Sequence, residues 1–279
     1  MFRLIFSTLI LCISLTASAQ IQLPAMSPLQ EMTQKIGLSS VSLSYSRPSL
    51  RGRSLFGPQG ILLPGEKWRT GANAVTKIEC SKDLEINGQT LSKGAYVLLT
   101  TPQENTWTFH FYPYEKRAYT HFLDKVPILE FTVESQKTAY STETLLIHFD
   151  AIHLGTANFV LQWEHYRVEV PIKTNEHQAI LSNIDKVLKG PSNFAYFQAA
   201  LYLHETKTDL PLALTYIRKA TQDESALFFQ VYREALILKD LNKVEEAIKA
   251  AKRAKELSEK AGNADLARLS QRMIEELSF

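Results

Sequence analysis

The side chains best suited to chemistry lie in one segment, Arg47–Asn73, which reads RPSLRGRSLFGPQGILLPGEKWRTGAN. This segment holds five basic residues against one acid, and prolines and glycines interrupt it throughout. Loops of this length are usually functional or disordered, and the large apolar residues within this one argue against disorder. A guanidinium group donates paired hydrogen bonds to an anion, and an indole offers a stacking wall. The sequence therefore predicts a site for a small anionic or carbohydrate ligand, formed by Arg47, Arg53, Trp68, Arg69 and Asn73.

Two other interpretations of this segment remain open. In the first, the arginines only hold the loop in place, by capping backbone carbonyls and pairing with Glu79, Asp83 or Glu85. The protein would then be a structural component of the cell envelope. In the second, the same pocket belongs to a hydrolase that uses Asp83 or a histidine as its base.

The sequence contains no standard catalytic signature: GxSxG, SxxK and HExxH are all absent. The best metal-ligand candidates are His148, Asp150 and His153. On a strand, His148 and Asp150 would share a face, and a turn would have to bring His153 back to them. A closed zinc site needs three or four ligands, so this irregular spacing predicts neither a metal nor another cofactor.

The first nineteen residues have the pattern of a secretory signal peptide. A basic start, Met1–Arg3, precedes an apolar run of twelve residues, and small residues follow. We expect cleavage between Ala19 and Gln20 and a periplasmic or secreted mature protein. Cleavage would remove Cys12 and leave Cys80 as the only thiol.

The composition is that of an ordinary globular protein. The chain has 279 residues, 45% of them hydrophobic, and its formal net charge is only +2. These values exclude a disordered chain, a collagen-like repeat and a nucleic-acid binder that works through bulk charge. After the signal peptide, no uninterrupted apolar stretch is long enough to predict a transmembrane segment.

The pattern up to Pro171 predicts a β-rich domain. Short alternating or apolar runs are separated by turn residues, among them the Asn87-Gly88 pair typical of tight hairpins. Eight or nine strands without intervening helices favour an antiparallel sandwich or barrel. The later predicted strands are Leu129–Val133, Thr144–Phe149, Asn158–Trp163 and Tyr166–Val170.

After Pro171 the apolar residues follow the period of helices. A first stripe of Ile180, Ile184, Val187 and Leu188 stops at Gly190-Pro191. Paired alanines at an offset of 34, Ala213/Ala247 and Ala220/Ala254, resemble those of tetratricopeptide repeats. The further predicted helices are Asn193–Glu205, Leu210–Thr221, Glu224–Leu238, Lys243–Glu259 and Ala264–Leu277.

Several motifs occur together in an order that is specific. YSRPSLRGRSLFG, LLPGEKWRTGAN and SKDLEINGQTLSKGAYVLLTTP resemble a bacterial secreted family catalogued as domain of unknown function 2911. The resemblance covers roughly Ile36 to Pro171. It implies an exported protein with a β-rich domain and no assigned reaction, to which the helical part is an extension.

The expected architecture is thus α+β, with three parts: a signal peptide (1–19), a β-rich domain (20–172) and a helical, tetratricopeptide-like domain (173–279). The function that we expect is that of a binding or scaffold protein. Its β-domain would hold the small ligand, and its helices would dock a protein partner. We expect no cofactor and no nucleic-acid partner, and whether the protein is an enzyme stays open.

Overall fold

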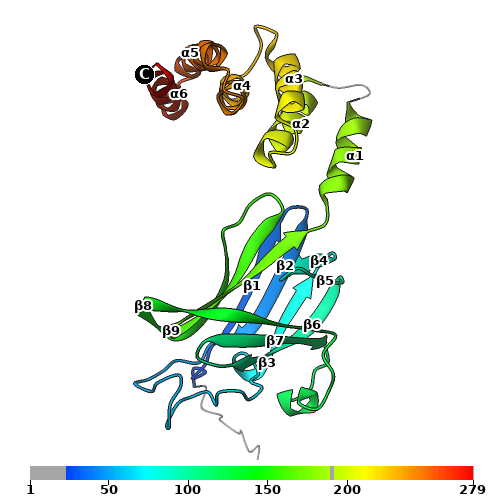
Figure 1. Ribbon diagram of the computed structural model, residues 1–279, viewed down its shortest axis with the longest axis vertical. Coiled ribbons are helices and arrows are strands. Elements are labelled where there is room, and N and C mark those ends of the chain that lie inside the picture. The colour runs from blue at the N-terminus through cyan, green and yellow to red at the C-terminus, as the bar shows by residue number, and fades with distance from the viewer. Residues whose placement is uncertain (1–22, 189–191, 279) are drawn as a thin grey trace, which may run out of the picture.

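The computed structural model describes residues 23–188 and 192–278 (Figure 1). The predicted signal peptide, 1–19, lies outside the described residues. The described chain begins with β1 (Leu29–Ile36), β2 (Ser39–Ser46), β3 (Ala72–Cys80), β4 (Leu84–Ile86), β5 (Gln89–Leu91), β6 (Gly94–Pro102) and β7 (Thr106–Pro113). A short 3-10 helix, Tyr119–Phe122, leads to the long strands β8 (Leu129–Asp150) and β9 (Thr156–Thr174).

These strands form one antiparallel sheet in the order β1-β2-β3-β6-β7-β8-β9-β4-β5. The sheet folds over on itself because β8 pairs with β7 up to Glu134 and with β9 from Ser135 onward. Strand β2 thereby faces β8 across the core, where the buried Tyr45 hydroxyl bonds Ile147. The predicted α+β class is confirmed, but the sheet is not closed into a barrel, because β1 and β5 are its two ends.

The sequence prediction was wrong for β8 and β9, because it gave two short strands where the structure has one long strand in each case. No strand was predicted between Val133 and Thr144, where the chain instead continues as one strand. The register between β8 and β9 shifts at Lys137/Thr142 and again at Thr142/Leu146. This stretch is mostly polar because neither of its faces is fully buried, and a polar stretch without apolar periodicity predicts a loop.

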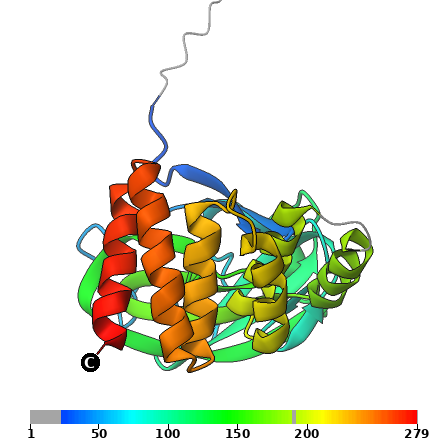
Figure 2. The ribbon, with the colours of Figure 1, turned by 90° about the horizontal axis from the view of Figure 1, so that it is seen from above.

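The chain after β9 is helical. The elements are α1 (His177–Val187), α2 (Asn193–Glu205), α3 (Leu210–Thr221), α4 (Phe228–Asp240), α5 (Val244–Lys260) and α6 (Ala264–Leu277). From α2 onward each helix packs against the next, and α4 also contacts α2 and α6 (Figure 2). Ser192, Asp209 and Asn263 begin α2, α3 and α6 with side chains that accept backbone N–H groups.

The repeated alanines lie at buried positions of these helices. Ala213, Ala220, Ala247 and Ala254 are all fully buried. A methyl group there lets two helices approach closely, which a longer side chain would prevent. None of the described helices is long and apolar enough to cross a membrane.

Candidate functional site

The segment that the sequence analysis selected packs into the β core. Leu50, Leu55, Phe56 and Leu62 are buried there, and the Phe56 ring meets Tyr166 edge-on at 4.9 Å. Its start also pairs with β8, where the β8–β9 register shifts: Leu50 N–H donates to Glu143 O and Leu145 N–H to Pro48 O, each at 2.9 Å. The segment is therefore an ordered part of the fold.

Two of the predicted arginines bind backbone carbonyl groups of the protein itself. Arg47 Nε donates to Leu145 O at 2.8 Å. Arg53 donates from Nε to Leu50 O at 2.9 Å and from Nη2 to Ser49 O at 3.1 Å. The Arg53 guanidinium thus binds carbonyl groups within the segment, and the Arg47 guanidinium binds β8. Both contacts are of the kind expected if these arginines have a structural role.

The predicted Trp68 and Asn73 also have structural contacts. The Trp68 indole stacks on Trp163, with ring centroids 5.6 Å apart, and lies edge-on to Trp107 at 6.2 Å. Asn73 adopts a left-handed backbone (φ 59°), and its amide donates to Ser27 O at 3.1 Å. Asparagine tolerates this conformation better than most residues, so its type has a conformational reason at this position.

A small pocket nevertheless remains at the end of the segment. It has a volume of about 170 Å³, and Lys67, Trp68, Arg69 and Tyr119 line part of it. The Arg69 guanidinium carbon lies 4.7 Å from the Tyr119 ring centroid, and Nη1 donates to Asn73 O at 3.2 Å. Lys67 Nζ donates to Leu123 O at 2.8 Å. Of the five predicted site residues, the structure brings only Trp68 and Arg69 to one pocket.

Of the three metal-ligand candidates, Asp150 has other side-chain partners, whereas the buried His148 Nδ1 has no hydrogen-bond partner among the described residues. Asp150 forms an ion pair with Arg167 at 3.0 Å and accepts the Ala151 N–H. The pKa of the half-buried His148 is lowered by burial and by the nearby Arg167. Among the described residues, no group of three or more His, Cys, Asp or Glu side chains is arranged to hold a metal ion.

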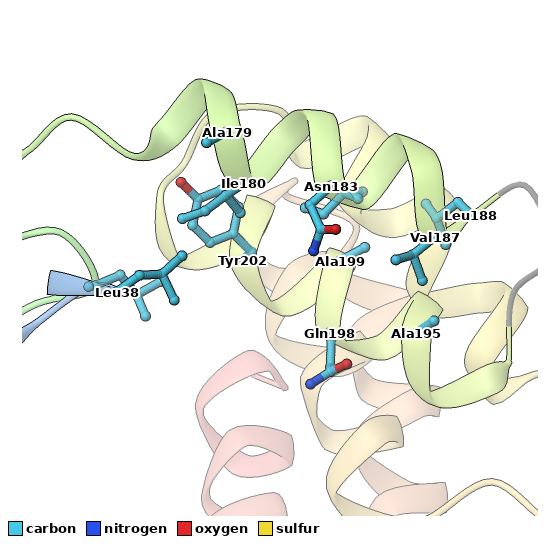
Figure 3. A pocket seen from close by; sticks show the side chains of 13 residues that line it. Leu38, Ala179, Ile180, Asn183, Val187, Leu188, Ala195, Gln198, Ala199 and Tyr202 are labelled. Atoms are coloured by element: carbon cyan, nitrogen blue, oxygen red, sulfur yellow. The ribbon is translucent and has the colours of Figure 1, made fainter.

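A larger cleft, which the sequence did not predict, lies between the sheet and the first helices (Figure 3). Its volume is about 470 Å³, within the range usual for small-molecule sites. The walls are α1, α2, the β1–β2 turn at Gly37-Leu38 and the β8–β9 turn at Leu154. The α1 stripe was visible in the sequence, but nothing in the sequence showed that it would face a cleft.

A second, more polar pocket of about 330 Å³ shares Leu154, Ile180 and Tyr202 with this cleft. His177 Nδ1 and the Tyr202 hydroxyl are 2.8 Å apart, and the two rings stack. The other polar residues that line this pocket are His153, Thr156, Lys173, Thr174, Glu176, Glu205, Thr206 and Thr208. The two pockets are therefore neighbours, one lined mainly by apolar and the other mainly by polar residues.

Glu176 joins the sheet to α1 beside these pockets. Its buried carboxylate accepts hydrogen bonds from Leu38 N–H (2.7 Å), Ser39 Oγ (2.8 Å) and Lys82 Nζ (2.9 Å). Burial raises the pKa of this carboxyl, but the three hydrogen bonds outweigh burial, and the pKa lies below its usual value. A side chain at Gly37 would be strained, because φ is 59° there and a Cβ would lie 2.9 Å from the backbone Leu154 O and 2.6 Å from Glu176 Oε2.

The fold is that of an antiparallel β-rich protein with a helical extension. Residues 27–172 match the model of a family described as a protein of unknown function (DUF2911). The chain belongs to this family, as the motifs of its arginine-rich segment predicted. Searches of curated proteins and of solved structures gave no match.

Proposed function

We propose that the protein is an exported binding protein whose β-domain holds a small anionic ligand at the pocket formed by Lys67, Trp68, Arg69 and Tyr119. The observation that carries the proposal is the position of Arg69. Its guanidinium lies over the Tyr119 ring at the pocket wall and donates one N–H to Asn73 O. An arginine has five N–H groups, so others are available to a carboxylate or phosphate.

The pocket is large enough only for a small ligand or for one end of a larger ligand. A space of about 170 Å³ is below the range of complete drug-sized sites and suits a single charged group. The Lys67 ammonium adds a second positive charge, which is partly offset by the exposed Glu66 at the rim. A sugar acid or another carboxylate that continues into solvent fits this arrangement better than a neutral sugar does.

Export is part of the proposal, and its support is the signal-peptide pattern in residues 1–19. Cell fractionation with an antibody against the mature chain tests it. We expect the protein outside the cytoplasm and its N-terminus, read by mass spectrometry, at Gln20. A cytoplasmic protein that keeps Met1 would exclude export.

The binding test compares two arginines of the same segment. Ligand binding should raise the melting temperature of the wild-type protein in a panel of carboxylates, phosphates and sugar acids. Arg69→Ala should abolish that shift, because it removes the N–H donors at the pocket wall. Arg53→Ala is the matched control, since Arg53 bonds Leu50 O and Ser49 O and is not a lining residue of this pocket.

Three results bear on the anion site. A ligand whose affinity falls at least tenfold in Arg69→Ala, and stays within twofold in Arg53→Ala, supports the site. A panel without any ligand would contradict it. Equal losses in the two variants, with both still folded by circular dichroism, would also contradict it, because the effect would then not be local.

The helices contribute the second part of the proposal, which is the docking of an apolar peptide segment from a partner protein. Exposed apolar residues gather where α2 and α4 begin: Phe194 is 52% and Leu227 48% exposed. The rings of Phe194, Phe197, Phe229 and Phe228 follow one another at 5.3–6.0 Å. The double variant Phe194→Ser, Leu227→Ser should stay folded and lose a partner that co-purifies with the wild type. Retention of that partner would contradict this part.

A further inference from the structure

The cleft between the sheet and α1 leaves apolar side chains uncovered on all its walls. Thirteen residues line it, and among them only Asn183, Gln198 and Tyr202 carry polar side-chain atoms. Leu38 is 65%, Leu154 45% and Val187 47% exposed. Exposed apolar surface that is gathered in one concave place, unlike scattered leucines, marks a binding site.

Helix α1 is unusual because it buries none of its residues. Its apolar stripe of Ile180, Ile184 and Val187 lines the cleft, whereas only Leu181 packs against the helical core. An amphipathic helix of a globular protein normally covers its stripe with the core. Here the stripe faces an open space, and a ligand would supply the missing contact.

The opposite wall keeps that space open. Ala195 and Ala199 lie one turn apart on α2, and their methyl groups occupy little of the volume below α1. Figure 3 shows Leu38 near one end of the cleft and Val187 with Leu188 near the other, with Tyr202 and Ala199 between them. The space is therefore elongated along α1, which suits a linear chain better than a compact ring.

The polar pocket that adjoins the cleft has one lysine available for an anion. Both acids that line it already have basic partners: Glu176 pairs with Lys82 at 2.9 Å and Glu205 with Arg233 at 2.5 Å. Within 23–188 and 192–278, Lys173 takes part in no ion pair, and its side chain is exposed. His177 and Thr208 add hydrogen-bonding groups beside it.

We propose that this space binds a linear alkyl carboxylate, a fatty acid, with its chain between α1 and α2 and its carboxylate near Lys173 and His177. Three features together favour this class of ligand: the apolar walls, the elongated shape and the adjoining polar pocket. In that pocket Lys173 forms no ion pair among the described residues, although it lies opposite Glu85 in the register of β4 and β9. The site is separate from the Arg69 pocket, and Arg69→Ala should leave fatty-acid binding unchanged.

The first experiment titrates the mature protein with octanoate, dodecanoate and hexadecanoate below their micellar concentrations. Each added methylene that reaches the apolar walls should tighten binding about fourfold. Hexadecanol, which has the chain but no carboxylate, should bind more weakly than hexadecanoate. Absence of saturable binding at every chain length would overturn the proposal.

The second experiment places a charge on the cleft wall. Val187→Asp should weaken hexadecanoate binding at least tenfold, because a carboxylate would then face the alkyl chain. Val244→Asp is the matched control: this valine is also helical and 42% exposed, but it is not a lining residue of the cleft. Equal effects of the two changes, or no effect of Val187→Asp, would overturn the site.

The third experiment tests the carboxylate end. Lys173→Gln should weaken hexadecanoate about threefold, as expected for a solvent-exposed ion pair, and leave hexadecanol unchanged. Lys116→Gln, at an exposed lysine of the β-domain, serves as the control. If hexadecanol binds the wild type as tightly as hexadecanoate, carboxylate recognition is excluded.

Discussion

At the scale of single residues, the hydroxyl of Tyr45 shows most clearly how one atom joins the two layers of the sheet. It accepts the Ile147 N–H at 2.7 Å and lies 3.1 Å from Ile147 O, to which it donates. The ring is 1% exposed, so water does not replace these bonds when the hydroxyl is lost. Buried donors that lose their acceptor carry their full desolvation cost.

Tyr45→Phe should therefore lower the stability of the β part by about 1–3 kcal/mol. All three tryptophans, Trp68, Trp107 and Trp163, lie in this part, so denaturant unfolding followed by tryptophan fluorescence reports its stability. Tyr114→Phe is the matched control, because Tyr114 is 39% exposed and its hydroxyl has no hydrogen-bond partner among the described residues, so its loss should change stability by less than about 0.5 kcal/mol. A Tyr45→Phe effect as small as the control would contradict this role.

The residue types alone could not show whether the arginines of this segment bind a ligand or stabilise the loop. The sequence showed that Arg47, Arg53 and Arg69 concentrate in one segment, and it left binding and structural roles open. The distinction depends on which carbonyl groups lie within reach, and Leu145, the partner of Arg47, is almost a hundred residues away along the chain. A hydrogen bond between residues so far apart in the chain depends on the tertiary fold, and the local pattern of residue types does not predict it.

At the scale of elements, periodicity predicted the helices well and the long strands poorly. The bounds of α2, α3 and α6 are those that the sequence predicted, because a capping side chain marks the residue at which each helix begins. Strand β1 was missed, since it alternates between exposed and partly buried positions and lies at the edge of the sheet. Edge strands with little burial carry a weak hydrophobic pattern.

The close helix packing predicts a size limit at Ala247. Its side chain is fully buried, and the larger Leu side chain of Ala247→Leu should cost about 1–3 kcal/mol through overpacking. Because all six α-helices of the described chain follow β9, circular dichroism at the helical wavelength follows their unfolding. Ala264→Leu, at an exposed position of α6, should change stability by less than about 0.5 kcal/mol. Equal stability of the two variants would show that the position tolerates larger residues.

At the scale of the whole molecule, the cleft exists only because two parts with different periodicities meet. Its walls are two hairpin turns of the sheet and two helices, and the family match at 27–172 covers the turns but not the helices. The sequence predicted a β-rich part and a helical part, but nothing about the surface between them. That surface depends on the direction in which α1 leaves β9, and Glu176 sets this direction through its bonds to Leu38, Ser39 and Lys82.

The pH dependence of stability should reveal this junction. Hydrogen bonds to the ionised carboxylate hold the folded-state pKa of Glu176 below its unfolded value, which is about 4.3. Its contribution to stability is therefore present above pH 4.3 and is lost as the pH falls through the folded-state pKa. Glu176→Gln should be less stable than the wild type by about 1–3 kcal/mol at pH 7, and the difference should shrink at pH 3.

The same substitution tests whether the junction shapes the cleft. Because Leu38 N–H donates to Glu176 and the Leu38 side chain lines the cleft, a weaker junction displaces one wall. Glu176→Gln should then weaken hexadecanoate binding at pH 7, whereas Glu104→Gln, at an exposed turn of the sheet, should change neither stability nor binding. A destabilised Glu176→Gln protein with wild-type affinity would show that the junction supports the fold without shaping the binding site.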